Sequence, residues 1–350
     1  MREILPEELL SRPGFALLDV RAEIEFADGH LPGSRNLPLL RTAERHEVGI
    51  VYKREGQDAA VALGHRLVDP HRNERVRAWA AYLNETDQPV LTCARGGLRS
   101  QIAQRWLAEA GVTAARVRGG YKMLRRALLR QFEMPLRGFV VTGLTGSNKT
   151  GFVRSVGSPR AVDLERLAVH RGSAFGGLFQ PGPQPAQQTF ENAIGLALLQ
   201  NRAGGDFLFE DESRLVGRCV LPAPFFDGLR ALPRIFLESS EDDRVSHILE
   251  EYVEIPLRSL PAERVVNDLV GALRTLRGRL GGLAADEIER GVRAAFAGGD
   301  HRGWVTRLLR EYYDRLYEHA MDRHGAKPVF RGTAGECREW LRANSDLFRW

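Results

Sequence analysis

The feature that most constrains the fold is a glycine-rich loop between an apolar segment and a helix-like segment. The loop, Gly143–Thr150 (GLTGSNKT), directly follows the apolar residues Phe139–Thr142. Glycines allow a sharp turn at a strand end, and the N–H groups at the start of the next helix can surround a phosphate. Strand, loop and helix in this order are the unit of a parallel α/β sheet. The sequence therefore predicts an α/β domain with a phosphate-binding P-loop.

The residue types in this loop suit a diphosphate. The backbone amides wrap the ligand, Lys149 supplies a point charge, and Thr150 can bind a phosphate oxygen or a magnesium ion. Asn148 stands where the standard pattern has glycine, and asparagine is the next most tolerant residue for unusual backbone angles. The predicted diphosphate-binding residues are Gly143, Thr145, Gly146, Ser147, Asn148, Lys149, Thr150 and Arg214.

A second group of polar residues follows the P-loop. The strand predicted at Phe207–Phe209 enters an acidic run, and Arg214 beyond it could balance phosphate charge. We assign no metal ligand set and no tightly bound cofactor, although Mg²⁺ is a candidate at the acidic residues. A capped surface loop is the alternative for residues 163–176. The expected polar and acidic site comprises Asp163, Glu165, His170, Arg171, Glu210 and Glu212.

A loop nearer the N-terminus carries a thiol at the end of a predicted strand. The strand Pro89–Cys93 is followed by two glycines and by a predicted helix over Ser100–Ala110. Inward N–H groups and the positive end of that helix favour a thiolate, so we predict Cys93 as the catalytic nucleophile. A buried structural cysteine is the alternative. The residues predicted to bind an anion beside the thiol are Arg95, Gly96, Gly97 and Arg99.

Positive charge is concentrated in one segment. Residues 114–137 hold seven Lys or Arg and one Glu, whereas the whole chain has a net charge of only +5. Such a strip suits a polyanion such as nucleic acid, and a solvated helix face is the alternative. We predict that Arg125, Arg126 and Arg130 contact the phosphates of such a nucleic acid. Phe175, Phe179, Phe225 and Phe226 are candidates for holding a base or an apolar chain, with plain core packing as the alternative.

Length and composition set the domain organisation. A chain of 350 residues predicts two domains, and 43% apolar with 27% charged residues excludes a disordered tail or a fibre. We predict an α/β domain over 1–136 and a P-loop domain over 137–350 that is mainly helical from Glu241. Because no apolar run approaches 18 residues and Met1–Glu8 is no signal peptide, we expect a cytoplasmic protein with three free thiols.

The first domain resembles the rhodanese family of sulfur-transfer domains. The resemblance covers residues 1–135 and rests on Leu18–Arg21, Gly29–Asn36, Cys93–Ser100 and Gly119–Tyr121. It implies that Cys93 carries a chalcogen atom while the loop amides hold the anion. Sulfur-transferring members usually have four residues between the cysteine and the arginine. This chain has five, as in related phosphatases, so the wider loop could accept a larger anion.

The whole chain resembles the tRNA 2-selenouridine synthase family, in which a rhodanese domain precedes a P-loop NTPase-like domain. The runs that carry the resemblance outside the two loops are Glu47–Lys53, Asp163–Glu165, His170–Gly176 and Glu210–Arg214. It implies a transferase that replaces the sulfur of wobble 2-thiouridine in tRNA with selenium from selenophosphate, through an S-geranylated intermediate made from geranyl diphosphate. Cys93 and its loop would then serve the selenium step, and the P-loop would bind geranyl diphosphate.

Other functions remain open from the residues alone. An ATP-dependent rhodanese-type sulfurtransferase acting on RNA or a small molecule would use the same two loops. A phosphatase would need a general acid, and Ala94, Gly96, Gly97 and Leu98 cannot donate a proton. An RNA-binding module would not need the thiol.

Overall fold

The chain forms two compact units. In the computed structural model, which describes residues 2–317 and 327–347, the first unit comprises residues 1–134 and 186–200, and the second comprises 135–185 and 201–350. The predicted division at residue 136 lies close to the first crossing between the units. The prediction differs for helix α10 (Gln187–Asn201), which belongs to the first unit because Leu196 and Leu199 pack against its core.

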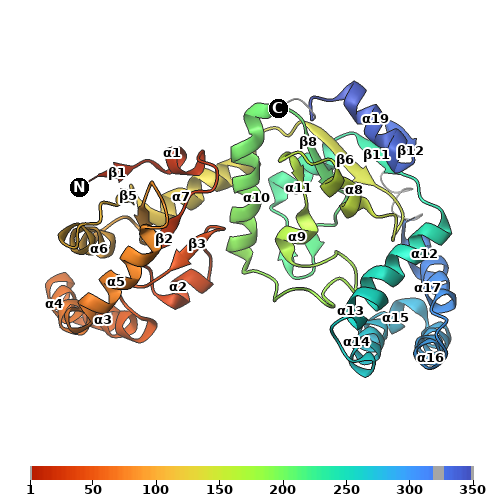
Figure 1. Ribbon diagram of the computed structural model, residues 1–350, viewed down its shortest axis with the longest axis horizontal. Helices are drawn as coiled ribbons and strands as arrows, with labels where there is room; N and C mark the ends of the chain where they lie inside the picture. Colours follow the sequence, from red (N-terminus) through yellow and green to blue (C-terminus); the bar gives the residue numbers. More distant parts are fainter. Residues whose placement is uncertain (1, 318–326, 348–350) are drawn as a thin grey trace. The chain divides into compact units, whose positions relative to one another are not determined.

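The first unit is built on a five-stranded parallel sheet (Figure 1). The strand order is β1-β5-β4-β2-β3, and every adjacent pair is parallel. Successive side chains of a strand point to opposite faces of the sheet, so Leu17 of β2 packs on one face and Leu18 on the other. Their bounds are β1 Glu3–Ile4, β2 Leu17–Asp19, β3 Ser34–Asn36, β4 Val90–Thr92 and β5 Ala115–Val117.

Helices cover both faces of this sheet. On one face Trp79 and Trp106 anchor α5 and α6, and on the other Leu9 and Leu124 anchor α1 and α7. The helices α3 and α4 form a hairpin around Gly56, whose φ of +89° allows the sharp reversal. The helix bounds are α1 Pro6–Leu10, α2 Glu23–Ala27, α3 Thr42–Glu55, α4 Gln57–Val68, α5 Arg72–Leu83, α6 Leu98–Glu109 and α7 Gly120–Leu129.

The second unit holds another five-stranded parallel sheet, in the order β12-β11-β6-β8-β7 (Figure 1). The central strand β6 leads into the P-loop, and its neighbour β8 leads into the acidic run. Ligands of open α/β sheets bind at the carboxyl ends of the strands, so this edge positions the second site. The strand bounds are β6 Gly138–Thr142, β7 Ala161–Val162, β8 Phe207–Glu210, β11 Arg234–Leu237 and β12 Phe330–Gly332; β9 Leu215–Val216 and β10 Cys219–Val220 form a separate hairpin.

Helices pack on this sheet and also form a helical region of their own. Phe152 and Leu341 bury α8 and α19 against the sheet, whereas the helices after β11 surround Leu273, Ile288 and Trp304. The helix bounds are α8 Lys149–Ser155, α9 Leu164–Ala168, α11 Ala223–Ala231, α12 Glu241–Leu249, α13 Ile255–Leu257, α14 Ala262–Thr275, α15 Arg277–Leu280, α16 Gly282–Gly298, α17 Arg302–Leu308 and α19 Ala334–Asn344.

The predicted fold class, α/β in both domains with a mainly helical C-terminal part, is confirmed. One strand departs from the expected helical pattern after Glu241, because β12 pairs with β11 as an edge strand. A strand of three residues is too short to show the alternation of polar and apolar residues by which a strand is recognised in a sequence.

The three cysteines are free and buried. Among the described residues, none of the helices is both long and apolar enough to span a membrane.

Candidate functional site

The Cys93 loop lies between β4 and α6, as predicted. Gly96 has φ +65°, and a Cβ there would lie 2.8 Å from the carbonyl of Val117. Gly120 packs under the loop so closely that a Cβ would lie 2.3 Å from the Cys93 carbonyl. Both positions therefore require glycine. The Tyr121 N–H donates to the Cys93 carbonyl at 2.9 Å, so the first turn of α7 is hydrogen-bonded to the loop.

The thiol itself is enclosed. Cys93 is 3% exposed, and its Sγ lies 3.1 Å from the Ser100 hydroxyl, which in turn donates to the Gly97 carbonyl at 2.9 Å. Ser100 is in the first turn of α6, so the thiol sits at the positive end of that helix, as predicted. The Ser100 hydroxyl accepts a hydrogen bond from the thiol and donates its own to Gly97, so the favourable electrostatic contribution at the sulfur is that of the start of α6.

The two loop arginines differ in their surroundings. Arg99 forms a bidentate ion pair with Glu25, in which one guanidinium nitrogen lies 3.0 Å from Glu25 Oε1. Burial raises the pKa of Glu25, but the hydrogen bonds and charge from Arg99 outweigh it and hold that pKa below its ordinary value. Arg95 is exposed and has no ion pair in the described part of the chain. Arg95 is thus the loop cation available to an incoming anion, and Glu25 is a partner that the sequence pattern did not indicate.

A buried ion pair supports the loop. Asp19 at the end of β2 pairs with Arg21 at 2.7 Å, and the Arg21 guanidinium lies 3.8 Å from the centre of the Tyr121 ring. Arg21 also donates to the Gly29 carbonyl at 2.8 Å. These contacts join the motifs Leu18–Arg21, Gly29–Asn36 and Gly119–Tyr121, which are distant in sequence, beneath the Cys93 loop.

The P-loop has the predicted form. Asn148 adopts φ +60° and ψ +40°, and its side chain accepts a hydrogen bond from the Gly151 N–H at 3.1 Å as the N-cap of α8. The asparagine therefore supplies the left-handed conformation and caps the helix as well. The Lys149 ammonium donates to the Gly143 carbonyl at 2.8 Å. The Ser147 hydroxyl is buried with no hydrogen-bond partner among the described residues.

Three carboxylates gather beside Thr150. Oxygens of Glu165, Glu210 and Glu212 lie within 4.8 Å of one another, and the Thr150 hydroxyl lies 2.8 Å from Glu165 and also contacts Glu210. Burial and the neighbouring negative charges raise the pKa of all three, that of Glu212 to about 8. Oxygen donors of this kind suit Mg²⁺, and a cation would relieve their repulsion.

The other predicted polar residues have separate roles. Asp163 caps α9 through the Arg166 N–H at 2.7 Å and pairs with Arg154. His170 lies against Gly217, and burial lowers its pKa. Arg171 lies 3.6 Å from Glu251 and stacks over the Tyr252 ring. Arg171 lines the cavity described next, whereas Asp163, His170 and the exposed Arg214 do not.

A cavity of about 380 Å³ opens at the P-loop, and its lining includes both polar and apolar side chains. The polar side chains include Lys149, Thr150, Glu165, Arg171 and Glu212. The apolar side chains include Phe175, Leu269 of α14, and Trp304, Val305 and Leu308 of α17. Sequence patterns missed the α14 and α17 side chains, because they resemble ordinary core residues.

Helix α12 is attached to the P-loop beside this cavity through Arg244. Arg244 of α12, which is 3% exposed, donates to the Thr145 carbonyl at 2.8 Å and pairs with Asp314. Of the four candidate phenylalanines, only Phe175 lines this cavity. Phe225 is 1% exposed and packs edge-on against Phe209 in the core.

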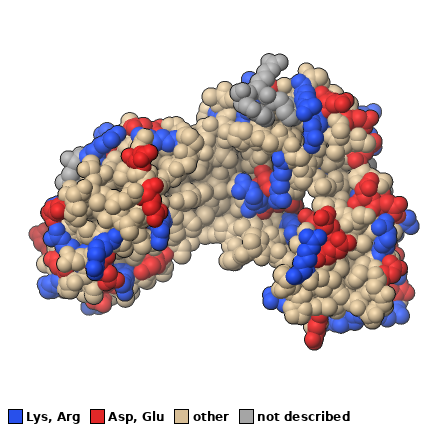
Figure 2. Space-filling model, in the orientation of Figure 1, with Lys and Arg blue, Asp and Glu red and all other residues tan. Residues whose placement is uncertain are grey.

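The basic strip is not one continuous surface. Arg125 pairs with Glu191 of α10 and donates to Asn192 at 3.0 Å, so it holds α10 on α7. Arg126 and Arg130 are exposed and have no ion pair in the described ranges. Elsewhere in the strip, Arg116 pairs with Glu3 and Arg137 with Asp206. Figure 2 shows charges of both signs interspersed on the face in view.

Comparison with known proteins identifies the families of both domains. The profile of the tRNA 2-selenouridine synthase AAA domain matches residues 136–347, and that of the rhodanese-like domain matches residues 6–127. A tRNA 2-selenouridine synthase of Alcanivorax borkumensis is 40% identical, covering 93% of this chain and 95% of its own. The tRNA 2-selenouridine synthase of Hahella chejuensis is 41% identical and covers 95% of this chain and 92% of its own. That of Bordetella bronchiseptica is 43% identical and covers 93% of this chain and 94% of its own. On this evidence the chain belongs to the tRNA 2-selenouridine synthase family.

Proposed function

We propose that the chain is a cytoplasmic tRNA-modifying transferase that exchanges the sulfur of wobble 2-thiouridine for selenium. Geranyl diphosphate first alkylates the sulfur, and selenophosphate then supplies selenium. A thiocarbonyl sulfur is hard to expel from a pyrimidine ring, whereas an alkylated sulfur leaves as a thiol. Family membership over nearly the whole chain supports the overall reaction.

One observation supports the geranyl step: residues of the P-loop and apolar side chains line the same cavity of the second unit. A prenyl diphosphate has the same two parts. The amides of the P-loop, Lys149 and the Ser147 hydroxyl, which has no hydrogen-bond partner among the described residues, would bind the diphosphate, with Arg171 nearby. Phe175, Trp304 and Leu308 would enclose the hydrocarbon chain and keep it from water.

In this step the thiocarbonyl sulfur attacks C1 of the geranyl group. The C–S bond forms, the C–O bond to diphosphate breaks, and the base loses its N3 proton. Negative charge develops on the departing diphosphate, where Lys149 and the loop amides are already oriented. If Mg²⁺ binds beside Thr150, then Glu165, Glu210 and Glu212 would hold it and its charge would further stabilise the diphosphate.

The selenium step belongs to the first unit in this proposal. The Cys93 thiolate adds to C2 of the alkylated base, and the bond from C2 to the geranyl sulfur breaks. Selenium of selenophosphate then displaces Cys93 from C2, and water cleaves the P–Se bond to release phosphate. Each step is redox-neutral. Arg95 and the amides of Gly96 and Gly97 would bind selenophosphate; since the thiol is nearly buried, the loop must open when the base binds.

Mass spectrometry of nucleosides tests the proposal. Purified protein is incubated with thiolated tRNA and geranyl diphosphate, and selenophosphate is added afterwards. We expect the mass of one geranyl group to appear on 2-thiouridine, followed by 2-selenouridine with release of geranylthiol. Formation of neither product would contradict the proposal.

A nucleotide titration separates the ATP-dependent sulfurtransferase. That function requires ATP to bind the P-loop and to be hydrolysed during sulfur transfer. The present proposal instead predicts that geranyl diphosphate binds there and that ATP is not consumed.

A further inference from the structure

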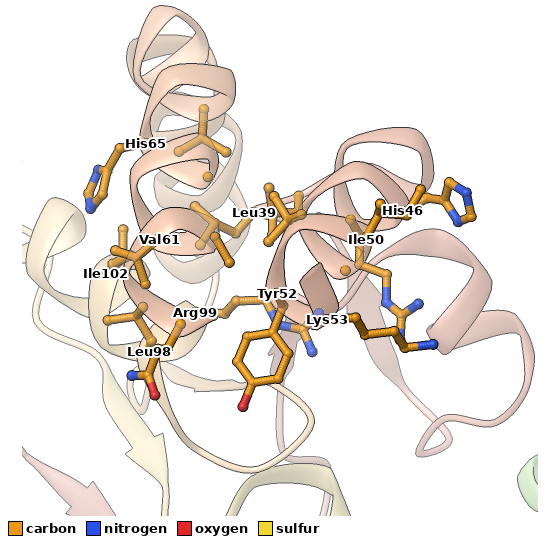
Figure 3. Close-up of a pocket in the computed structure, with 18 of the residues that line it drawn as sticks. Leu39, His46, Ile50, Tyr52, Lys53, Val61, His65, Leu98, Arg99 and Ile102 are labelled. Atoms are coloured by element: carbon orange, nitrogen blue, oxygen red, sulfur yellow. The ribbon is translucent and has the colours of Figure 1, made fainter. Parts of the chain in front are cut away.

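The first unit contains a second cavity that the proposed chemistry does not yet use. It measures about 790 Å³ and lies between the α3–α4 hairpin and the start of α6 (Figure 3). Figure 3 shows Val61, Leu98 and Ile102 on one side, with Ile50 and Lys53 on the other. Most of the lining is apolar, contributed by Leu39, Leu40, Val48, Ile50, Val61, Val68, Leu98 and Ile102.

The charged residues around this cavity are all basic. Arg45, Lys53, Arg95 and Arg99 line it, and its lining as described includes no Asp or Glu. Glu25 pairs with Arg99 at 3.0 Å and lies 3.7 Å from Arg45. Lys53 and Arg95 have no ion pair within residues 2–317 and 327–347. A ligand that matches this cavity has an apolar part and an anionic part.

The cavity adjoins the Cys93 loop. Arg95 belongs to that loop, and Leu98 and Arg99 form the first turn of the helix that follows it. An apolar group held here would therefore be attached to the molecule that reacts at Cys93. We assign a free prenyl diphosphate to the second unit instead, because the P-loop there provides backbone amides and Lys149 for its diphosphate.

We propose that this cavity holds the geranyl chain of the S-geranylated base while tRNA undergoes the selenium step. Lys53 and Arg95 would contact flanking phosphates, and the hydrocarbon chain would lie along Ile50 and Val61. Burial of each methylene removes apolar surface from water, so the site selects alkylated over unalkylated tRNA. This inference rests on the proposed function and assigns it a second prenyl-binding site.

The test uses tRNA that carries S-geranyl-2-thiouridine from chemical synthesis. Val61→Glu places a charge in the cavity wall, whereas Ala62→Glu places the same charge on the exposed side of the same helix. Ile50→Glu is a second wall variant at a position already 37% exposed, where folding tolerates a charge. Selenation of this tRNA is measured as kcat/KM with the full-length protein and selenophosphate.

We expect both wall variants to lose at least about 10-fold in kcat/KM on the geranylated tRNA, the size expected when a few methylenes lose their apolar contact. Ala62→Glu should match the unaltered chain. With an S-methyl analogue, which cannot fill the cavity, the unaltered chain should be slower and the wall variants should cause no further loss. Thermal unfolding followed by circular dichroism, compared with that of the unaltered chain, reports whether the first unit of each variant is folded.

The outcomes separate the two proposals. If the unaltered chain does not convert geranylated tRNA, the proposed function fails. If it does, but the wall variants keep full activity or lose it equally on the S-methyl analogue, the cavity does not hold the geranyl chain. Inhibition of selenation by free geranyl diphosphate that the wall variants abolish would assign the cavity to that substrate and overturn the inference.

Discussion

At the residue scale, Glu212 of the acidic cluster makes the stability of the folded chain depend on pH. Its pKa of about 8 results from burial and from the negative charge of Glu165, against an ordinary value of 4.5. Between these two pH values the folded chain holds a proton that the unfolded chain releases. The free energy of unfolding therefore decreases as pH rises from about 4.5 to about 8.

Replacing Glu212 by glutamine should remove the part of this pH dependence that Glu212 contributes, while the raised pKa values of Glu165 and Glu210 leave the remainder. We expect Glu212→Gln to have nearly the stability of the unaltered chain at pH 5 and to be more stable by on the order of 1–3 kcal/mol at pH 8. Urea unfolding between pH 5 and 8 in EDTA measures the difference. Glu263→Gln, at an exposed position of α14, is the control. A Glu212→Gln variant that is less stable at every pH would show that the carboxylate stabilises the fold.

Asn148 illustrates how much the local sequence predicts. Its tolerance of a left-handed backbone is a property of the asparagine side chain, and the structure confirms φ +60° there. Gly96 of the Cys93 loop likewise adopts a left-handed backbone, with φ +65°, which glycine tolerates. By contrast, Glu25 is 74 residues from Arg99 in sequence, and no local pattern identifies that pair.

At the scale of elements, α10 is the clearest departure from the expected domain ranges. It follows a loop rich in proline and glycine, and its polar residues face the first unit. Asn192 is fully buried and donates both to the Tyr121 hydroxyl and to the His30 carbonyl at 2.9 Å. Each contact joins residues more than 70 positions apart, which is why residue spacing along the chain could not reveal it.

The arginines of α7 should divide into two classes. Replacing Arg126 and Arg130 together by glutamine should weaken tRNA binding and reduce the slope of log affinity against log salt by roughly 0.7–0.9 per lost phosphate contact. Replacing Arg125 by glutamine should instead lower stability, by about 1–3 kcal/mol, because Glu191 loses its partner.

Filter binding over a range of salt concentrations, together with urea unfolding, distinguishes these effects. Arg66→Gln, an exposed arginine of α4, is the matched control for loss of one positive charge. If the Arg126 and Arg130 double variant binds tRNA with an unchanged salt slope, the tRNA surface lies elsewhere.

At the scale of the whole molecule, each unit should serve one half of the reaction. Cys93→Ala should reduce selenation of geranylated tRNA by roughly 100-fold or more while geranylation continues. Lys149→Ala should reduce geranylation by roughly 100-fold, because the leaving diphosphate loses a cation, while geranylated tRNA is still selenated. Supplying each substrate separately and quantifying nucleosides by mass spectrometry checks both. Loss of both activities in both variants would contradict the division.

The sequence by itself determined the two strand–loop–helix motifs, the α/β class and the position of both loops. Glycine, asparagine and cap preferences act over a few residues, so their order along the chain is sufficient. Tertiary structure alone decided which charges are available, since Arg99 and Arg125 find carboxylates far away in sequence. It also decided that α14 and α17 complete the P-loop cavity and that the α3–α4 hairpin builds the second one. Cavities depend on which apolar side chains remain uncovered after packing, a property of the assembled fold.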